Sequence, residues 1–498
     1  MWWEYSYYVV YWFSFFERAS LLHEKRYHLS SAWYLNLLHI PSIGSNGQAL
    51  FWGTETSGWE HPPLCLPQPI LIIRAHPSFG TRVETPEGVV IRESEDCGST
   101  PLMWAQEILE EFSHQGSTTA KRLMKRPSFP LATVALSYEY GRTIPPHQHC
   151  FPRMSASQVD DVYIAIHSCG FVLLNGQWQL VGAKPSSRYT WNHWKLEPEK
   201  AVWPKPPQGT RVDQGGYQGD LLGMDHRELA SPWSFPVYQE AISCIQEHLH
   251  RGDIYQANLT IPFRGKTTLR GYELFARGIA LGGERYAAHL CTATGEHISF
   301  SPELLLRRWG RQVCTKPIKG TRPVQHESLP WGEKDLAEHL MIVDLERNDL
   351  GRLCHYGSVR VDPLMETNRH HGIEHLESTV HGTLRREESL KNLLRAIYPG
   401  GSVTGAPKRR ALEILSQLET HPRGIYCGAI GWLDHYGDVE LNLPIRTATL
   451  YSGGDLHLAA GGGIVADSVA EEEWRELHHK LGFFAGLLGL DWQLPNVG

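Results

Sequence analysis

The sequence lacks several features that would assign a protein to a class at once. Its 498 residues contain no uninterrupted apolar run of about 18 residues, the length that a membrane-spanning helix needs. Lys and Arg total 47 against 54 Asp and Glu, a formal net charge of −7, and no long basic run occurs. This balance counts against a protein that tracks nucleic-acid phosphates with a basic stripe. We therefore expect a soluble chain with no nucleic-acid partner and no membrane partner.

Cysteine offers no framework either. Nine cysteines are scattered along the chain, and no two have the Cys-x-x-Cys spacing. An odd, dispersed set counts against disulfides and against a cysteine-based zinc site, and it fits a reducing cytoplasm. Histidine is abundant, with 27 copies, and two clusters are candidate metal ligands: His371 with His375, and His147 with His149 and Cys150. Neither shows the further ligand that zinc needs, so surface histidines are the simpler interpretation.

Two glycine-rich segments lack the residues that complete a nucleotide-binding loop. GGSVTGAPK (400–408) has the glycine spacing of a phosphate loop, but Ala406 and Pro407 stand where Lys-Ser/Thr is required. We expect a tight turn there, feeding a helix with Pro407 in its first turn. Gly461, Gly462 and Gly463 follow a strand pattern, but no helix-opening G-x-G-x-x-G comes after them. Close approach of the backbone to a ligand and a plain bulge are the two interpretations.

The two ends of the N-terminal half are the least regular parts of the chain. Residues 1–16, MWWEYSYYVVYWFSFF, are aromatic and lack the basic start and cleavage site of a signal peptide. We expect an edge strand or an extension, with an interfacial anchor or a misassigned start as alternatives. Residues 190–232 are rich in Trp, Pro and Gly without periodicity, which indicates a long connection. The predicted division is an N-terminal, mostly β region over 1–227 and a second region over 228–490.

What the chain does contain is a mixture of strands and amphipathic helices. Strands are predicted over 162–167 and 171–174, with Asn175-Gly176 as a hairpin turn, and hairpins over 427–443 and 447–459. Helices are predicted over 102–113, 235–253 and 334–349, the last with Leu336, Leu340 and Val343 as its buried stripe. A further amphipathic helix is expected near the C-terminus, from the spacing of Trp474, Leu477, Leu481, Phe484 and Leu488. Long helices among antiparallel strands indicate an α+β fold.

A few charged residues are candidates for chemistry. Glu338, Glu473 and Glu476 lie on predicted helices, where a solvated face is the simplest interpretation of each one. Two carboxylates that converge from separate helices would suit Mg²⁺, which completes its shell with water and substrate oxygens. Lys319, in KPIKGTRP (316–323), is either a surface charge or, if burial removes its proton, an amine nucleophile.

Several segments then occur in the order seen in chorismate-utilising enzymes. They are RGDIYQANL (251–259), SPELLL (301–306), PIKGTRP (317–323), DLAEHLMIVDLERNDLGR (335–352), GGSVTGAPK (400–408), YCGAIGW (426–432), IRTA (445–448) and GGGIVADS (461–468). This ordered set covers about 235 to 485 and resembles component I of aminodeoxychorismate synthase, the sister of anthranilate synthase component I. The resemblance implies the fold of anthranilate synthase component I, with antiparallel sheets flanked by helices in interwoven layers. It also makes 228–490 a chorismate-binding core.

Two positions of the resemblance bear on the reaction. Family members that add water to chorismate carry a lysine base where this chain has Gln256, and an amide cannot deprotonate water. Anthranilate synthases resemble PIAGT where this chain has PIKGT, with Lys319. The resemblance therefore implies amination of chorismate by ammonia to 4-amino-4-deoxychorismate, for p-aminobenzoate and folate. Synthesis of anthranilate, for tryptophan, is the alternative.

The resemblance also implies roles for single residues. Lys319 would attack C2 as a neutral amine, Glu303 would protonate the departing C4 hydroxyl, and His375 would lie beside the ring. Glu338 and Glu476 would hold Mg²⁺, with Glu473 next to them. The substrate would lie against the remaining matched positions: Gln256, Gly320, Thr321, Thr404, Tyr426, Arg446, Gly461, Gly462 and Gly463.

One departure and one partner complete these expectations. HLEST (375–379) places Glu377 where the family's HLVST has an apolar residue. The sequence shows no Cys-His-Glu amidotransferase module. The resemblance therefore implies that ammonia comes from a separate glutamine amidotransferase subunit.

Overall fold

The computed structural model describes residues 47–52, 63–66, 69–85, 88–98, 100–113, 129, 131–144, 159–174, 177–182, 229–280, 285–323, 331–370, 373–490 and 492. The predictions for residues 1–16, for 190–228 and for the turn at 175–176 lie outside these ranges. So do the cluster around His147 and His371. The cysteine side chains that the structure describes form no disulfide, as expected.

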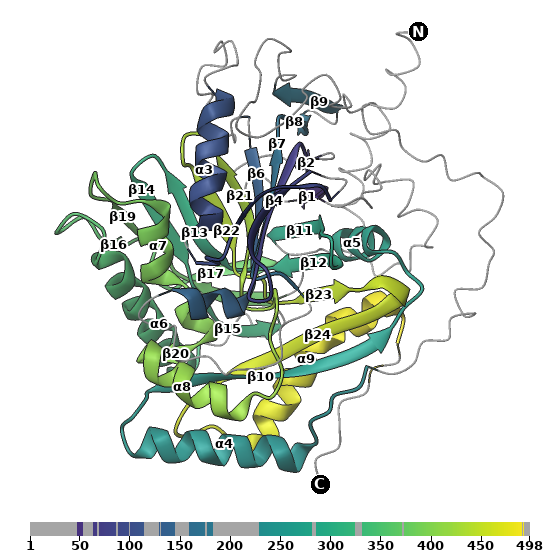
Figure 1. Cartoon of the computed structure of the whole chain (residues 1–498). Coiled ribbons are helices and arrows are strands. Elements are labelled where there is room, and N and C mark those ends of the chain that lie inside the picture. Colours follow the sequence, from purple (N-terminus) through teal and green to yellow (C-terminus); the bar gives the residue numbers. More distant parts are fainter. Residues whose placement is uncertain are drawn as a thin grey trace.

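A ten-stranded antiparallel sheet crosses the middle of the molecule (Figure 1). Strands from both sides of residue 228 are hydrogen-bonded in it, so the layers are interwoven along the chain. Its order is β20 (Gly405–Ala406), β10 (Gln256–Lys266), β24 (Asp455–Ile464), β23 (Thr447–Leu450), β12 (Glu296–Ser301), β11 (Tyr286–Cys291), β1 (Ala49–Trp52), β2 (Leu64–Leu66), β8 (Cys169–Leu174) and β9 (Gln177–Gly182).

A second antiparallel sheet has eleven strands and again combines both parts of the chain. Its order is β16 (Arg360–Val361), β19 (Val380–Thr383), β14 (Gln312–Lys316), β13 (Leu304–Trp309), β22 (Val439–Asn442), β21 (Ala429–Asp434), β6 (Leu131–Leu136), β7 (Val162–His167), β3 (Leu71–His76), β4 (Gly80–Glu84) and β5 (Val90–Ser94). A three-stranded sheet is formed by β15 (Ile318–Pro323), β18 (Ile373–Glu377) and β17 (Glu366–His370). The predicted hairpins over 427–443 and 447–459 are confirmed by the pairs β21–β22 and β23–β24.

The described helices cover these sheets. They are α3 (Thr100–Ser113), α4 (Phe235–His250), α5 (Gly271–Ala280), α6 (Glu333–Gly351), α7 (Leu390–Ile397), α8 (Lys408–Leu418) and α9 (Ala470–Leu488). In Figure 1, α4, α8 and α9 lie along the long β10–β24 pair. Pro407 directly precedes α8, so the predicted turn does feed a helix. The four helices expected from periodicity are all confirmed.

The apolar stripe of α9 is confirmed, whereas the one predicted for α6 is wrong at Leu340. All five predicted stripe residues of α9 are buried, and Trp474 packs against the rings of Phe235 and Tyr238 on α4. Leu340 is 52% exposed, because the inward face of α6 mixes polar residues such as Glu346 with apolar ones such as Ile342. His339, on that face, is buried and lies 2.7 Å from the Ser378 hydroxyl. A search for apolar spacing cannot find a buried face that mixes polar and apolar residues.

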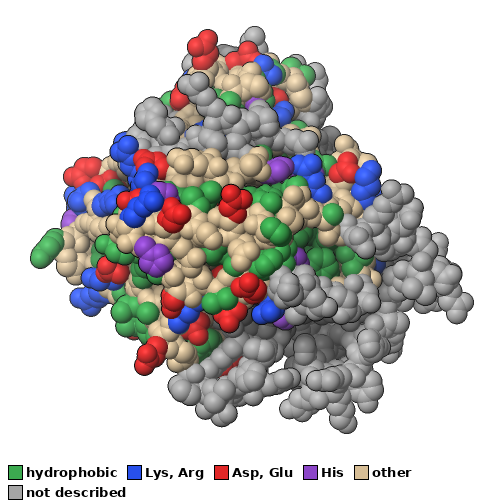
Figure 2. All heavy atoms as spheres, turned by 90° about the horizontal axis from the view of Figure 1, so that it is seen from below, with side chains coloured by type: hydrophobic (Ala, Val, Ile, Leu, Met, Phe, Trp, Pro, Cys, Tyr) green, Lys and Arg blue, Asp and Glu red, His purple; other side chains and the backbone are tan. Residues whose placement is uncertain are grey.

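The described surface carries charges of both signs. Figure 2 shows acidic and basic side chains interspersed over one face of the molecule, among scattered apolar ones. None of the described helices combines the length and the apolar character that crossing a bilayer requires.

Candidate active site

The ends of two central strands bring several predicted residues together. β10 and β24 pair from Ala257↔Ile464 to Lys266↔Asp455, so Gln256 lies close to Gly463. A Cβ atom on Gly463 would lie 2.5 Å from Gln256 Nε2 and 3.3 Å from Lys319 Nζ. Glycine at this position is therefore what allows the amide and the amine to approach the strand. Both polar atoms of the Gln256 side chain are buried without a hydrogen-bond partner among the described residues.

A β-bulge separates Lys319, which lies at this place, from His375, whose ring lies against the Gly320 backbone. β15 pairs with β18 through Lys319↔Leu376 and Thr321↔His375, and the register shifts between the two pairs, at Gly320. Gly320 has φ +65°, and a Cβ on it would lie 2.9 Å from the ring of Trp331. His375 Nδ1 lies 3.3 Å from the carbonyl oxygen of Gly320. Because a bulge re-aims the side chains beside it, Gly320 sets the directions of both residues.

Burial changes the proton affinity of Lys319. Loss of solvent lowers the pKa of its ammonium, because the charged form is the one that water stabilises. The second cation, Lys480, lowers the pKa further, whereas Glu338, Glu303 and Glu476 oppose the change. The net direction is downward, so Lys319 is closer to a neutral amine than an exposed lysine is.

Glu303 has the complementary shift. It stands between β12 and β13 and is buried, which raises the pKa of its carboxyl to about 7. The Ser402 hydroxyl donates a hydrogen bond to Glu303 Oε1 at 2.8 Å, and this bond together with the charge of Lys319 limits the rise. A carboxyl that titrates near neutral pH can both give and take a proton at working pH.

The three candidate metal ligands lie on α6 and α9, and lysines lie against them. Lys334 Nζ is 4.0 Å from Glu338 Oε1 and 3.9 Å from Glu473 Oε1, so one cation already bridges the two helices. Lys480 Nζ is 2.8 Å from Glu476 Oε1, and it also donates to the carbonyl oxygen of Gly461 at 2.9 Å. We call Glu338, Glu473 and Glu476 the carboxylate rim.

The carboxylate rim could hold a divalent cation only together with other ligands. Among the described residues, the rim oxygens do not form a group of three potential ligand atoms that all lie within 4.8 Å of one another. Mg²⁺ at the rim would therefore need water or substrate oxygens as well, which is its usual habit. A Cβ on Gly462 would lie 3.1 Å from Glu473 Oε2, so β24 also borders the carboxylate rim at its three glycines, Gly461, Gly462 and Gly463.

Arg446 and Tyr426 lie beside the same strand pair, nearer its middle. Tyr426 lines a cavity of about 410 Å³ together with Thr447 and with Ala459, which stands four residues before Gly463. Arg446, next to Thr447, has φ +52°, a conformation that non-glycine residues seldom adopt. Burial lowers the pKa of its guanidinium to about 10. A bound anion would offset that unfavourable desolvation.

The remaining predicted residues have roles in the backbone around the site. The Thr404 hydroxyl donates to the carbonyl oxygen of Gly400 at 2.9 Å, so its proton is committed to the turn. Thr321 pairs with His375 in the sheet, and its side chain lies outside the described part of the structure. The structure thus gathers Lys319, Gln256, Glu303 and the carboxylate rim, and places Tyr426 and Arg446 along the adjoining strands.

Sequence reasoning missed the partners of these residues. The pairs Lys334–Glu338 and Glu476–Lys480 have i, i+4 spacing, a signal that predicted helices could have supplied. Nothing in the spacing links Ser402 to Glu303, which stands 99 residues away.

Glu377 is also explained by partners that are remote in sequence. Its side chain is 2% exposed and forms an ion pair with Arg285, which is buried. Lys316 Nζ lies 3.6 Å from Glu377 Oε1, and Asn368 donates to the same oxygen at 3.0 Å. A carboxylate therefore occupies the apolar position of the family's motif because cations surround it here.

Comparison with known proteins places the chain in a family. Residues 71–486 match the model of the chorismate binding enzyme family. The chain belongs to that family.

Its relatives include aminodeoxychorismate synthase component 1 of Bacillus subtilis, 37% identical over 262 residues (51% of this chain, 55% of that protein). The same component of Escherichia coli is 39% identical over 266 residues (51% and 58%), and anthranilate synthase component 1 of Thermus thermophilus is 37% identical over 274 residues (53% and 59%). The chain spans between a half and three fifths of the length of these relatives.

Solved structures confirm the predicted α+β fold. Anthranilate synthase component I of Streptococcus pneumoniae matches with a TM-score of 0.65 at 22% identity, over 93% of this chain and 94% of that one. The menaquinone-specific isochorismate synthase of Escherichia coli matches with a TM-score of 0.63 at 16% identity, over 93% and 92%. The predicted fold of the chorismate binding enzymes is therefore correct.

Proposed function

We propose that this chain is a chorismate-aminating subunit that makes 4-amino-4-deoxychorismate from chorismate and ammonia. The observation that carries the proposal is the setting of Lys319, a half-buried residue whose amine has a lowered pKa and lies beside Gly463 and the Gln256 amide. An aminodeoxychorismate synthase component 1 and an anthranilate synthase component 1 match the chain at the same 37% identity. The choice between the two reactions therefore rests on Lys319.

Binding of chorismate would use the cations and the three glycines of β24. Arg446 offers a planar guanidinium that pairs with a carboxylate through two hydrogen bonds. Gly461 and Gly463 have no side chain of their own, so the ring could approach their backbone closely, beside Gln256 and Lys319. Mg²⁺ held by Glu338 and Glu476, with Glu473 beside them, would neutralise the ring carboxylate and withdraw electron density from the ring.

In the first step the neutral Lys319 amine attacks C2 of chorismate. A new N–C2 bond forms, the two ring double bonds shift, and the C4–O bond breaks. Glu303 supplies the proton that lets the hydroxyl leave as water. The carboxyl is suited to this because its pKa of about 7 leaves much of it protonated at neutral pH.

In the second step ammonia attacks C4 and reverses the shift of the double bonds. The N–C2 bond breaks, Lys319 leaves as the free amine, and the added nitrogen loses its extra proton to Glu303. Splitting one displacement into two in this way is the general advantage of covalent catalysis. Gln256 carries no basic group, so water beside it is not activated to compete.

The ammonia is proposed to come from a separate glutamine amidotransferase subunit. The purified chain is then expected to use ammonium salts, better at higher pH where more free NH₃ exists, and to be inactive with glutamine. Product from glutamine and the isolated chain would contradict this part of the proposal.

Mass spectrometry of the product from chorismate, Mg²⁺ and ammonium tests the proposal. The expected product is 4-amino-4-deoxychorismate with intact enolpyruvate. Anthranilate and pyruvate would instead establish the alternative, an anthranilate synthase component I. Failure to consume chorismate under saturating Mg²⁺ and ammonium would refute both.

A further inference from the structure

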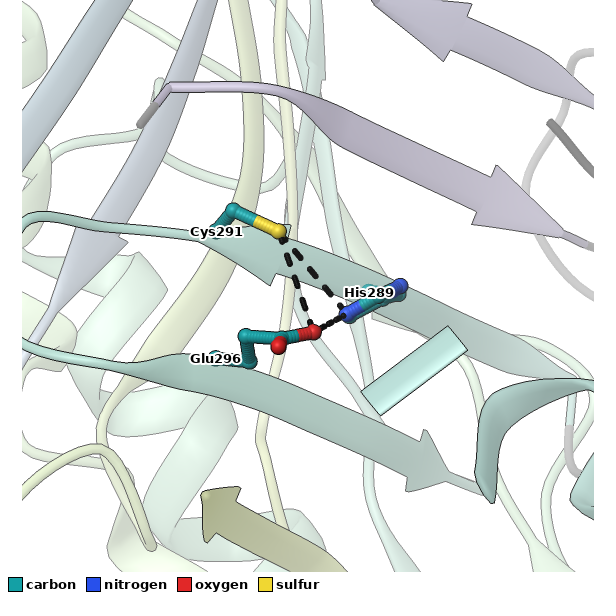
Figure 3. Close-up of side chains that lie close together, drawn as sticks. All are labelled: His289, Cys291 and Glu296. Atoms are coloured by element: carbon teal, nitrogen blue, oxygen red, sulfur yellow. Dashed lines mark hydrogen bonds and ion pairs between the residues drawn. The ribbon is translucent and has the colours of Figure 1, made fainter. Parts of the chain in front are cut away.

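We propose a second metal site, unrelated to the carboxylate rim, in which His289, Cys291 and Glu296 bind a divalent transition metal of the zinc class. The three residues lie on the hairpin of β11 and β12 (Figure 3). Among the described residues they form the group of histidine, cysteine and acidic ligands that could hold an ion. No Cys-x-x-Cys spacing marks this site, because its ligands come from two strands.

The register of the hairpin creates the group. His289 and Cys291 are two residues apart on β11, so their side chains project from the same face of the sheet. Cys291 stands directly opposite Glu296 on β12, which puts the carboxylate on that face as well. α5 packs over the hairpin and closes the group from above.

The three ligand atoms lie near the separations of a zinc site, and His289 and Glu296, now at hydrogen-bond distance, would move apart to admit the ion. His289 Nε2 lies 2.8 Å from Glu296 Oε2, and Cys291 Sγ lies 3.9 Å from each of these two atoms. A point equidistant from the three atoms is about 2.1 Å from each, which matches zinc bonds to nitrogen and oxygen and is about 0.2 Å shorter than a zinc–sulfur bond. An ion could therefore enter with little movement of the ligands.

Gly271, the first residue of α5, lies against the group, and any side chain at this position would collide with its ligand atoms. A Cβ on Gly271 would lie 2.1 Å from Glu296 Oε2 and 2.8 Å from His289 Nε2. The His289 ring is fully buried and stacks on Phe275 at 5.8 Å between centroids. The Glu296 side chain is 28% exposed, which provides a route of entry from solvent.

The charges also fit. Coordination removes the thiol proton of Cys291 to solvent, so a divalent ion with one thiolate and one carboxylate makes a neutral centre. A neutral centre suits a buried place. The rival interpretation is a hydrogen-bonded His289–Glu296 pair beside a cysteine that takes no part.

Such a site would be structural. Glu296 is the first residue of β12, and Glu303 follows the end of that strand. Their seven-residue separation spans about 23 Å at the rise of an extended strand. The same strand donates the Phe300 amide to the carbonyl oxygen of Arg446 at 3.0 Å. Metal that ties β11 to β12 would thus steady the strand that leads to Glu303 without touching the substrate.

Titration of the metal-free full chain with Co²⁺ tests the site, because sulfur ligands give cobalt a charge-transfer band that carboxylates at the rim do not. We expect this band to saturate at one Co²⁺ per chain and to be removed by Zn²⁺. Cys291→Ser should abolish it. Cys65→Ser is the matched control, since Cys65 is another buried, free cysteine in the same sheet, and it should leave the band unchanged.

A second variant covers the case in which Cys291→Ser does not fold. Glu296→Gln should keep the sulfur band and weaken Co²⁺ binding at least about tenfold, in line with the loss of one ligand. Absence of the band in the wild-type chain, or its survival in folded Cys291→Ser, would overturn the proposal. Equal affinity in Glu296→Gln would overturn the assignment of the carboxylate.

Discussion

Two pairs of oppositely charged residues in the candidate active site behave differently. Glu303 is buried and Lys319 is half-buried, and they form no ion pair among the described contacts. Loss of solvent raises the pKa of Glu303 and lowers the pKa of Lys319, so it favours the neutral form of each. Glu476 and Lys480 form an ion pair at 2.8 Å, with the glutamate side chain 60% exposed, and Lys480 lowers the pKa of that glutamate. Solvent, more than residue type, therefore separates groups that move protons from groups that stay charged and attract a cation.

The largest effect is expected from the amine of Lys319. Lys319→Arg keeps a positive charge, but a guanidinium does not become a neutral nucleophile, so turnover should fall by about 10³-fold or more. Steady-state rates with saturating ammonium measure this. Lys316→Arg, in the adjoining strand, keeps an ion pair with Glu377 and serves as the matched control. Robust C4 amination by Lys319→Arg would mean that only the charge of Lys319 matters.

Changes at the exposed pair should act through the metal. Glu476→Gln removes one charge from the carboxylate rim, and we expect activity to fall by about 100-fold or more at fixed Mg²⁺. Glu338→Gln should do the same, whereas Glu472→Gln, exposed on the same helix as Glu476, should not. Titration of activity with Mg²⁺ separates weakened binding from lost chemistry. Near-normal rates for both rim variants at saturating Mg²⁺ would disprove the assignment.

The sequence allowed prediction of the helices and hairpins whose signal is local. The α9 stripe and the hairpin of β21 and β22 depend on spacing within a few residues, and both are confirmed. The inward face of α6 was mispredicted at Leu340 because tertiary packing buries polar His339 there. No local pattern reveals such a face.

The candidate site divides in the same way. The residues of the ordered motifs, such as Lys319 and Gln256, were predicted because the motifs are specific as a set. Their partners were not predicted, because Ser402 and Glu303, or Arg285 and Glu377, meet only through the fold. The proximity of His289 and Cys291 to Glu296 likewise depends on strand register.

A third pair sharpens the comparison, because Arg285 and Glu377 are buried and yet paired. Glu377→Val would restore the family's apolar residue but remove the carboxylate that Arg285 contacts. Breaking a buried ion pair from one side costs about 3–5 kcal/mol, and we expect urea unfolding to show a loss of that size. Arg285→Met combined with Glu377→Val should recover much of it. If Glu377→Val alone were as stable as the parent, the ion pair between Arg285 and Glu377 would not contribute to the stability of the fold.

The smallest effect concerns the hydroxyl that limits the pKa of Glu303. Ser402 donates to the Glu303 carboxylate and so stabilises its charged form. In Ser402→Ala that pKa should rise above about 7, and the high-pH fall in kcat/KM, where the acid form is lost, should move up by about one pH unit. Ser468→Ala removes a matching 2.8 Å hydrogen bond to Glu473 and should leave this limb in place. If the high-pH fall in kcat/KM moved equally in both variants, a group other than Glu303 would be responsible for it.

The central claim is that Lys319 is the nucleophile, and the most direct test is to look for its bond to the substrate. The full chain is incubated with chorismate and Mg²⁺ in the absence of ammonia, and its intact mass and peptides are then measured. The account predicts an adduct of chorismate less water on the peptide that contains Lys319, which disappears on addition of ammonium and is absent from Lys319→Arg. An active enzyme that never carries this adduct, or that carries it on another residue, would contradict the covalent mechanism.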